Sequence, residues 1–360
     1  LIERFDQESD PHLQIDLALQ ISDLTRSQGI FDLSDKYASI SLKLADQINS
    51  SAFQIQSLFA LGANFCIQKK VDQSNECFLK AIDIAETAQE IDFLPSCYNN
   101  MGNLKFYSGD IDLALVYYHK ALKILPEKQT ELFKANLLNN IGTALCEMEK
   151  DADAIHYLKE AIKILSQKEV CPELANSFVN IANVYQAQND LALALGYYKR
   201  AIRIYEKFNH YNLNANYQNM IILFFSMKRY REALNYAFKA MDYNKKINDP
   251  ATQFYTCVSV LKIYMALKEF NLCDEYIALC EDLIEYVKKE DQLMHYHKTC
   301  SEFYESKNDY PKAIEHLHKC LEFSEKHHKS EYLQKIAEEK TKIDYELKHQ
   351  EAETYRKKTD

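Results

Sequence analysis

A recurring set of asparagines is the part of this sequence whose side chains are best suited to bind a ligand. An uncharged amide offers both N–H donors and a carbonyl acceptor. A row of amides therefore suits the repeating N–H and C=O groups of an extended peptide, which need partners once water is displaced. The candidate ligand-binding residues, which we call the asparagine column, are Asn100, Asn103, Asn140, Asn180, Asn183 and Asn219.

A structural role is the alternative for the asparagine column. Four of its members recur about every 40 residues, and Asn99, Asn139 and Asn176 lie beside it. Amides at such a spacing can also bond to one another between neighbouring helices, without any ligand. The sequence leaves both interpretations open.

Other residue types that could do chemistry lack the spacing that chemistry needs. The pairs His295/His297 and His316/His318 are each two residues apart, so on a helix their side chains point about 200° apart and neither pair chelates by itself. Zinc-type Cys/His spacing, a Gly-rich phosphate loop, a nucleophile elbow and a kinase signature are all absent from the sequence. We expect no enzyme activity, no metal and no cofactor.

The composition indicates a helical protein with reduced cysteine thiols. Hydrophobic residues make up 47% of the chain, yet it has only six Gly and six Pro among 360 residues, which favours long helices with short turns. The net charge of −10 disfavours binding to nucleic acid. The apolar run at 220–227 is far shorter than the roughly 20 residues of a membrane span. Ten cysteines without a CxxC pair indicate reduced thiols and a cytoplasmic location.

The elements that position the asparagine column are repeated helix pairs. Residues 95–126 read as two amphipathic helices joined by a tight turn, and the pattern returns from starts near 55, 135, 175, 214, 254 and 294. Within each unit, positions 8, 20 and 27 are small and positions 11 and 24 are mostly large. In the unit at 95, the small residues are Gly102, Ala114 and Ala121, and Tyr118 is the large residue at position 24. Such a unit buries its apolar face only against its neighbours.

This pattern resembles the tetratricopeptide repeat in its longer form, with a period near 40. The matching stretches are Asn-Met-Gly-Asn at 100–103, Gly109-Asp110, Ala114-Leu115 and residues 118–122. The resemblance implies an all-α, right-handed α-solenoid of seven to eight helix pairs, with the first helix of each pair on the concave side. It also implies that the asparagine column binds a peptide there. We expect a degenerate capping repeat at 1–54, with serines in place of the small residues, and a tandem array at 55–329.

The last segment, 330–360, is expected to form one long helix. Its apolar residues have a coiled-coil-like spacing, at Leu333, Ile336, Ile343 and Leu347. Residues 345–358 are similar to the connector helix that follows bacterial repeat arrays and leads into an output domain, commonly a GGDEF diguanylate cyclase. The first residue is Leu1 rather than Met, and the last residues are still helical in character. We therefore expect a piece of a longer protein, homodimeric through this helix when full-length.

The function expected from these features is recognition and regulation. A peptide, protein segment or small effector would bind the concave groove and control an attached output domain through the C-terminal helix. Two other classes stay open: a free-standing peptide-responsive regulator resembling the Rap and PlcR-type quorum-sensing proteins, and a static protein–protein scaffold.

Overall fold

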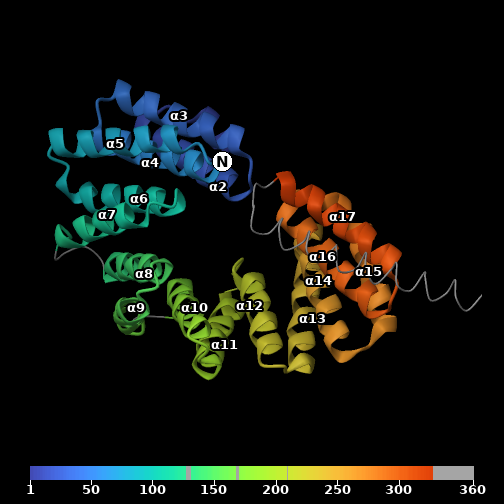
Figure 1. Ribbon diagram of the computed structural model, residues 1–360. Coiled ribbons are helices and arrows are strands. Elements are labelled where there is room, and N and C mark those ends of the chain that lie inside the picture. Colours follow the sequence, from blue (N-terminus) through green and yellow to red (C-terminus); the bar gives the residue numbers. More distant parts are fainter. Residues whose placement is uncertain (127–130, 168–169, 209, 327–360) are drawn as a thin grey trace, which may run out of the picture. The chain divides into compact units, whose positions relative to one another are not determined.

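The computed structural model describes residues 1–126, 131–167, 170–208 and 210–326, and these ranges are helical without any β-strand (Figure 1). The helix predicted at 330–360 lies outside the described residues. Contacts divide the chain into two compact units, Leu1–Ile204 and Tyr205–Asp360. The even spacing of the repeats gives no sign of this division.

The first unit holds the helices up to α11, which continues across the boundary. In chain order they are α1 (Ile2–Gln7), α2 (Pro11–Ser27), α3 (Phe31–Gln47), α4 (Ser51–Ile67), α5 (Val71–Thr87), η1 (Ile91–Phe93), α6 (Leu94–Tyr107), α7 (Ile111–Lys123), α8 (Glu131–Glu147), α9 (Asp151–Leu165), α10 (Pro172–Ala187) and α11 (Leu191–Phe208). The second unit contains α12 (Leu213–Ser226), α13 (Tyr230–Ile247), α14 (Pro250–Leu267), α15 (Phe270–Leu283), η2 (Ile284–Tyr286), α16 (Glu290–Ser306) and α17 (Tyr310–Lys326).

From α2 to α17 the described helices form eight consecutive pairs, which confirms the predicted all-α solenoid of helix pairs. We call the first helix of each pair the A helix and the second the B helix. In the first unit each A helix packs on the next A helix as well as on its own partner, from α2 through α4, α6 and α8 to α10. Consecutive B helices of this unit do not pack on one another to that degree. The A helices therefore line the inner side of this unit.

A missing side chain explains how closely the A helix approaches its B helix in three of the pairs. A Cβ atom added to Gly102 on α6 would lie 2.6 Å from the ring of Tyr118 on α7, which is closer than van der Waals contact allows. In this pair glycine lets the large residue at position 24 lie directly against the A-helix backbone. The same contact joins Gly62 to Phe78 and Gly142 to Leu158.

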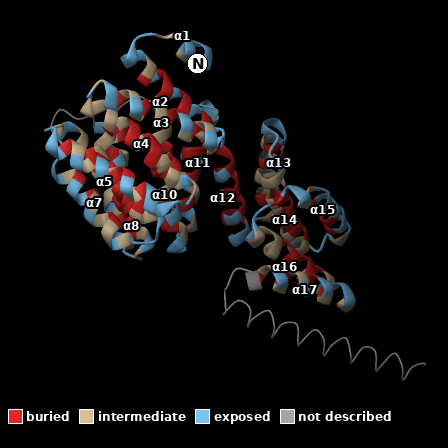
Figure 2. Cartoon of the chain, turned by 90° about the horizontal axis from the view of Figure 1, so that it is seen from above, coloured by how far each residue is buried: buried red, intermediate tan, exposed pale blue. Residues whose placement is uncertain are grey.

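Burial follows the predicted pattern of small residues. The alanines at positions 20 and 27, such as Ala114, Ala121, Ala154 and Ala161, are fully buried. Figure 2 shows that buried residues lie on the helix sides that face other helices, with exposed residues outside. Among the described residues, no helix is both long and apolar enough to cross a bilayer.

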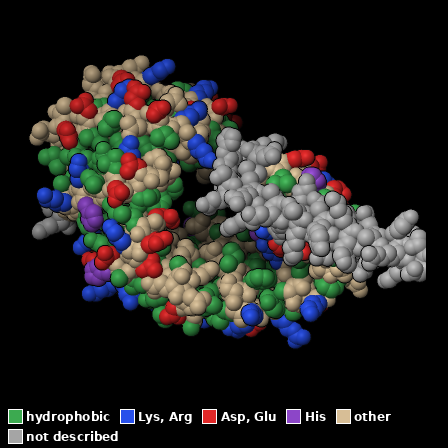
Figure 3. Space-filling view, in the orientation of Figure 1, with side chains coloured by type: hydrophobic (Ala, Val, Ile, Leu, Met, Phe, Trp, Pro, Cys, Tyr) green, Lys and Arg blue, Asp and Glu red, His purple; other side chains and the backbone are tan. Residues whose placement is uncertain are grey.

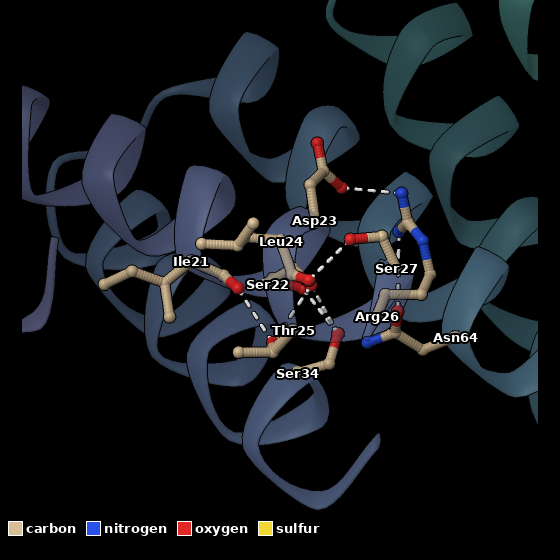
Figure 4. A network of polar contacts seen from close by, with 9 residues as sticks. All are labelled: Ile21, Ser22, Asp23, Leu24, Thr25, Arg26, Ser27, Ser34 and Asn64. Atoms are coloured by element: carbon tan, nitrogen blue, oxygen red, sulfur yellow. Dashed lines mark hydrogen bonds and ion pairs between the residues drawn. The ribbon is translucent and has the colours of Figure 1, made fainter. Parts of the chain in front are cut away.

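In the first pair, α2 and α3, serines take the place of the small residues, as expected for residues 1–54. The Ser34 hydroxyl donates to the backbone oxygen of Ser22, 2.8 Å away, and both residues are fully buried (Figure 4). Ser41 and Ser57 join α3 to α4 in the same way, with their hydroxyl oxygens 2.6 Å apart. A serine is small enough for this contact, but its hydroxyl is stable there only when it is hydrogen-bonded, because an unpaired buried hydroxyl is unfavourable.

Most of the tight turns are made by a residue in the left-handed region. Gly109 has φ 85°, and between other helices the same position is held by residues with a side chain, such as Glu149 with φ 58°. Asp110, which follows Gly109, caps α7 by accepting a hydrogen bond from the Leu113 N–H at 3.3 Å. The turn residues thus end one helix and start the next within two or three positions.

Candidate functional site

The asparagine column lies on A helices, as the repeat pattern predicts. Asn100 and Asn103 are on α6, Asn140 is on α8, and Asn180 and Asn183 are on α10. All five belong to the first unit, whose inner side these helices line. Asn219 is on α12, in the second unit.

Asn140 connects two successive A helices through its amide nitrogen. Its Nδ2 donates to Oδ1 of Asn99 at 3.0 Å and to Oδ1 of Asn103 at 3.3 Å. Both acceptors are on α6, one turn apart, so the amide of α8 lies between them. The side chains are half-buried, where a net hydrogen bond contributes about 1 kcal/mol.

The same contact recurs one repeat later. Nδ2 of Asn180 on α10 donates to Oδ1 of Asn139 at 3.1 Å and to the hydroxyl of Thr143 at 3.1 Å, both on α8. Thr143 therefore supplies the acceptor that Asn103 supplies on α6. In both cases the amide at position 6 of one repeat, counted as Asn100 is from residue 95, donates to the side chains at positions 5 and 9 of the preceding A helix.

Two members of the asparagine column accept hydrogen bonds from buried tyrosines. Tyr118 donates to Oδ1 of Asn103 at 2.8 Å, and Tyr198 donates to Oδ1 of Asn183 at 2.5 Å. Burial raises the pKa of both tyrosines well above the ordinary value, so both hydroxyls keep their protons. Each tyrosine thus fixes the orientation of an amide on the inner side.

Asn100 differs from Asn140 and Asn180 because its neighbour offers no acceptor. The corresponding positions 5 and 9 on α4 are Phe59 and Ala63, which are apolar. Asn100 is half-buried and makes no side-chain hydrogen bond within the described part of the chain. The same is true of Asn219.

The chemistry of this face follows from which amide atoms are already used. Asn140 and Asn180 are held through nitrogen, and within the described ranges their Oδ1 atoms have no hydrogen-bond partner. They therefore present acceptors, whereas Asn100 presents both donor and acceptor. The hydrogen bonds between A helices are the ones that the structural alternative predicts. Ligand binding by the same residues stays a prediction.

The polar row extends further toward the N-terminus than the sequence analysis proposed. Figure 4 shows Arg26 of α2 between two partners: Nη1 donates to Oδ1 of Asn64 on α4 at 3.4 Å, and Nη2 lies 2.7 Å from Asp23. The signal in the sequence was weak, because Arg26 and Asn64 do not share the register of the asparagine column. They bridge neighbouring A helices nonetheless.

Charge is dispersed over the face of the first unit that Figure 3 shows. Basic and acidic side chains alternate there with hydrophobic ones and form no extended patch of one sign. Within the described residues, no three His, Cys, Asp or Glu side chains are placed to hold a metal ion. The hydrogen bonds of the asparagine column are themselves all between uncharged groups.

One polar contact escaped the sequence analysis entirely. His297 of α16 and His316 of α17 lie with their Nδ1 atoms 3.0 Å apart, and both are buried. Histidines two residues apart on one helix diverge, and their spacing gives no sign of a contact between helices. The contact joins one member of each predicted pair across two helices, and no spacing rule in the sequence announces it.

Comparison with known proteins identifies the repeat. The family model for the tetratricopeptide repeat matches residues 93–167, 133–207 and 173–246. Successive matches begin 40 residues apart, as the repeat spacing predicts. A search of curated proteins finds no significant match to this chain.

Solved structures with similar folds include several repeat proteins. A Rap protein complexed with competence and sporulation factor has a TM-score of 0.56 at 14% identity, with coverage of 94% of this chain and 99% of that chain. Aspartyl phosphate phosphatase F from Bacillus subtilis has a TM-score of 0.54 at 18% identity, with coverage of 87% of this chain and 74% of that chain. A signal-transduction ATPase with a tetratricopeptide repeat sensor from Pyrococcus horikoshii has a TM-score of 0.59 at 16% identity, with coverage of 77% of this chain and 44% of that chain. At these identities the likeness shows the fold alone.

Proposed function

Because residues 93–246 match the family model for the tetratricopeptide repeat, we propose that the first unit binds a peptide or protein segment on the inner side formed by α6, α8 and α10. The chain would act as a regulatory binding module and carry no catalytic site of its own. The asparagine column would supply the hydrogen bonds to the backbone of the bound segment.

The observation that carries this proposal is the way Asn140 and Asn180 are held. Each amide is anchored through Nδ2 to the preceding A helix at 3.0–3.3 Å. The anchoring restricts the side chain before a ligand arrives, which lowers the conformational entropy lost on binding. The Oδ1 atoms would then accept N–H groups of an extended segment, and Asn100 would add a donor as well.

One solved structure with a similar fold motivates the free-standing regulator as one form of the proposal. The Rap structure that covers 94% of this chain is a complex with competence and sporulation factor. A similar fold that holds a bound factor is the reason for proposing a binding role for this chain. A static scaffold would use the same inner side but would not change on binding.

The other form of the proposal is control of an output domain by the segment 330–360. There, a bound segment would alter the pairing of the predicted C-terminal helix in a homodimer and so switch an attached diguanylate cyclase. This form rests on the resemblance of residues 345–358. It is tested by measuring cyclic di-GMP synthesis from GTP by the full-length natural protein with and without the selected peptide.

The cytoplasm is the location that we propose for either form. All ten cysteines are free thiols in the structure, and seven of them are buried. Free thiols of this kind are usual in reducing compartments, where disulfides are rare.

Asn100 gives the sharpest test, because its side chain has no structural hydrogen bond to lose. A synthetic random heptapeptide library would be selected on the wild-type protein, and the affinity of the best binder measured by fluorescence anisotropy. We expect Asn100→Ala, and Asn140→Ala with Asn180→Ala, each to weaken binding at least tenfold. Asn235→Ala, at an exposed site on the B helix α13, should leave the affinity unchanged.

Circular dichroism of each variant separates binding from folding. A folded Asn100→Ala protein with wild-type affinity would remove Asn100 from the site. If the double variant also kept wild-type affinity, the whole asparagine column would return to a purely structural role. Failure of the library to yield any binder that competes at this face would contradict the proposal as a whole.

A further inference from the structure

A polar cavity in the second unit is independent of the asparagine column. It has a volume of about 470 Å³ and lies between α15 and α17, with side chains of α16 in its lining. Tyr296, His297 and Tyr304 come from α16, and His316 comes from α17. Charged residues of α15 and α17 also line it, together with a few apolar side chains.

The cavity exists because the regular packing of the array loosens at this point. Earlier B helices, such as α3, α5 and α13, pack closely on the following A helix, whereas α15 and α16 do not pack to the same degree. The helix α15 ends at Leu283, and the η2 turn at Ile284–Tyr286 replaces its last turn. Ile284 of this turn is part of the lining.

The pair His297/His316 fixes the hydrogen-bonding character of the cavity wall. Burial lowers the pKa of His297 to about 3 and of His316 to about 4, so both rings are neutral near neutral pH. Two neutral rings with Nδ1 atoms 3.0 Å apart share one hydrogen, so one ring donates and the other accepts. The donating ring then keeps a bare Nε2, and the accepting ring carries Nε2–H.

Those two Nε2 atoms are available to a ligand. Neither is bonded to another residue in the described ranges, and neither belongs to the buried polar atoms that lack a partner. Tyr304 stacks on His316 with ring centroids 5.5 Å apart, and Tyr296 meets the same ring edge-on at 6.2 Å. The packed rings thus hold one Nε2 donor and one Nε2 acceptor among the residues that line the cavity.

Opposite charges line the two helices that border the cavity. On α15, Asp274 and Glu281 are seven residues apart, and on α17, Lys312 and Lys319 have the same spacing. Seven residues are two helical turns, so each pair shares one face of its helix. Asp274, Lys312 and Lys319 have ion-pair partners in Lys307, Asp309 and Glu315, respectively.

Glu281 is different, because it has no hydrogen bond or ion pair with any described residue. Glu281 is an exposed residue of the cavity lining, and its carboxylate adds to the rise in the pKa of Cys300, which burial brings to about 12. Three carboxylates and two lysines line the cavity beside the neutral imidazoles. This balance disfavours phosphates and other anions, and an unpaired carboxylate calls for a cationic group.

We propose that the cavity binds a free α-amino acid. The ammonium group would lie at Glu281 and donate to the bare imidazole Nε2, while the carboxylate would accept from the imidazole Nε2–H and from Lys319 or Lys312. A diamine would leave the Nε2–H and the lysines without an acceptor, and a phosphate would leave Glu281 without a counter-charge. The site would make the second unit responsive to a small effector, whether or not the first unit binds a peptide.

Isothermal titration calorimetry of the whole chain with each of the common amino acids tests this inference, with putrescine and inorganic phosphate as competing chemistries. At least one amino acid should bind saturably, and Glu281→Gln should weaken it at least tenfold. Lys319→Gln should weaken it as well. Glu275→Gln is the matched control, since it removes the same charge from the same helix outside the cavity lining.

Nitrogen-15 NMR of the histidine rings adds a readout that a structural role would not move. Binding should shift the two Nε2 signals of His297 and His316 and leave exposed His318 unchanged. The inference is overturned if no amino acid binds at millimolar concentration, or if affinity survives Glu281→Gln in the folded protein. Binding of putrescine or phosphate in place of amino acids, with the same dependence on Glu281 or Lys319, would also overturn it.

Discussion

Asn140 donates its amide nitrogen to Oδ1 of Asn99, 3.0 Å away on the preceding A helix, and Asn180 repeats this relation with Asn139 at 3.1 Å. The column that was proposed to meet a ligand is thus also a ladder between repeats. The two roles use different atoms, since the ladder uses Nδ2 and a bound peptide would use Oδ1. They can therefore be separated by substitution.

Replacing Asn140 by Ala should lower the free energy of unfolding by about 1–2 kcal/mol. The change removes two hydrogen bonds to α6 and leaves Oδ1 of Asn99 without its donor in a half-buried position. Asn100→Ala removes no such bond and should stay within about 0.5 kcal/mol of the wild type. Urea unfolding measures both, and equal losses in the two variants would contradict the ladder.

Two glycine-to-alanine substitutions should act in opposite directions. A Cβ at Gly102 would lie 2.6 Å from the buried ring of Tyr118, so Gly102→Ala should destabilise by about 1–3 kcal/mol. Gly196 in α11 is exposed and has nothing within 4 Å of an added Cβ. Gly196→Ala should therefore stabilise by about 0.5–1 kcal/mol, through the higher helix propensity of alanine. Thermal melting of the two proteins side by side checks the opposite signs.

At turn positions with left-handed backbone, glycine should make the protein more stable than a residue with a side chain. Glu149 has φ 58°, a conformation that costs a residue with a side chain about 1 kcal/mol relative to glycine. Glu149→Gly should therefore raise the melting temperature, despite the extra freedom of glycine in the unfolded chain. Gly109→Ala, at φ 85° in the corresponding turn, should lower it. A stabilised Gly109→Ala protein would show that the turn conformation does not control stability here.

Acid should destabilise the second unit before carboxylates begin to protonate. Burial lowers the pKa of His295 to about 4, with the Lys262 ammonium 2.7 Å from its Nε2 adding to the effect, and the pKa values of His297 and His316 are lowered to about 3 and about 4. An unfolded histidine titrates near pH 6.5. Between that pH and about 4 the unfolded chain binds more protons than the folded one, so the free energy of unfolding falls as pH falls.

Several charges face these rings and set the size of the effect. Lys319 lowers the pKa values of His297 and His316 further, whereas Glu315 opposes this. Melting followed by circular dichroism at about pH 7 and about pH 5 should show the loss, and His297→Gln should reduce it. Replacement of the exposed His318 by Gln should leave the pH dependence as in the wild type. A melting temperature independent of pH in this range would contradict neutral, buried rings.

The sequence by itself determined the architecture, because its information is local and repeated. The small residue at position 8 and the large one at position 24, such as Gly102 and Tyr118, require a close helix pair wherever they recur. The scarcity of Gly and Pro leaves helix as the only regular structure. The register also placed the asparagine column on the A helices, since position 6 follows from the same count.

Only the tertiary structure decided which atoms meet between helices. The nitrogen of Asn140 lies between Asn99 and Asn103 because of how far α8 is rotated and shifted on α6, and a hydrogen bond tolerates only a few tenths of an ångström. The contact of His297 with His316 depends on how α17 packs on α16, and the cavity beside it is bordered by α15 and the η2 turn, which no repeat pattern specifies. Helix periodicity gives the face on which a residue lies, and the packing of one helix on the next gives its partner.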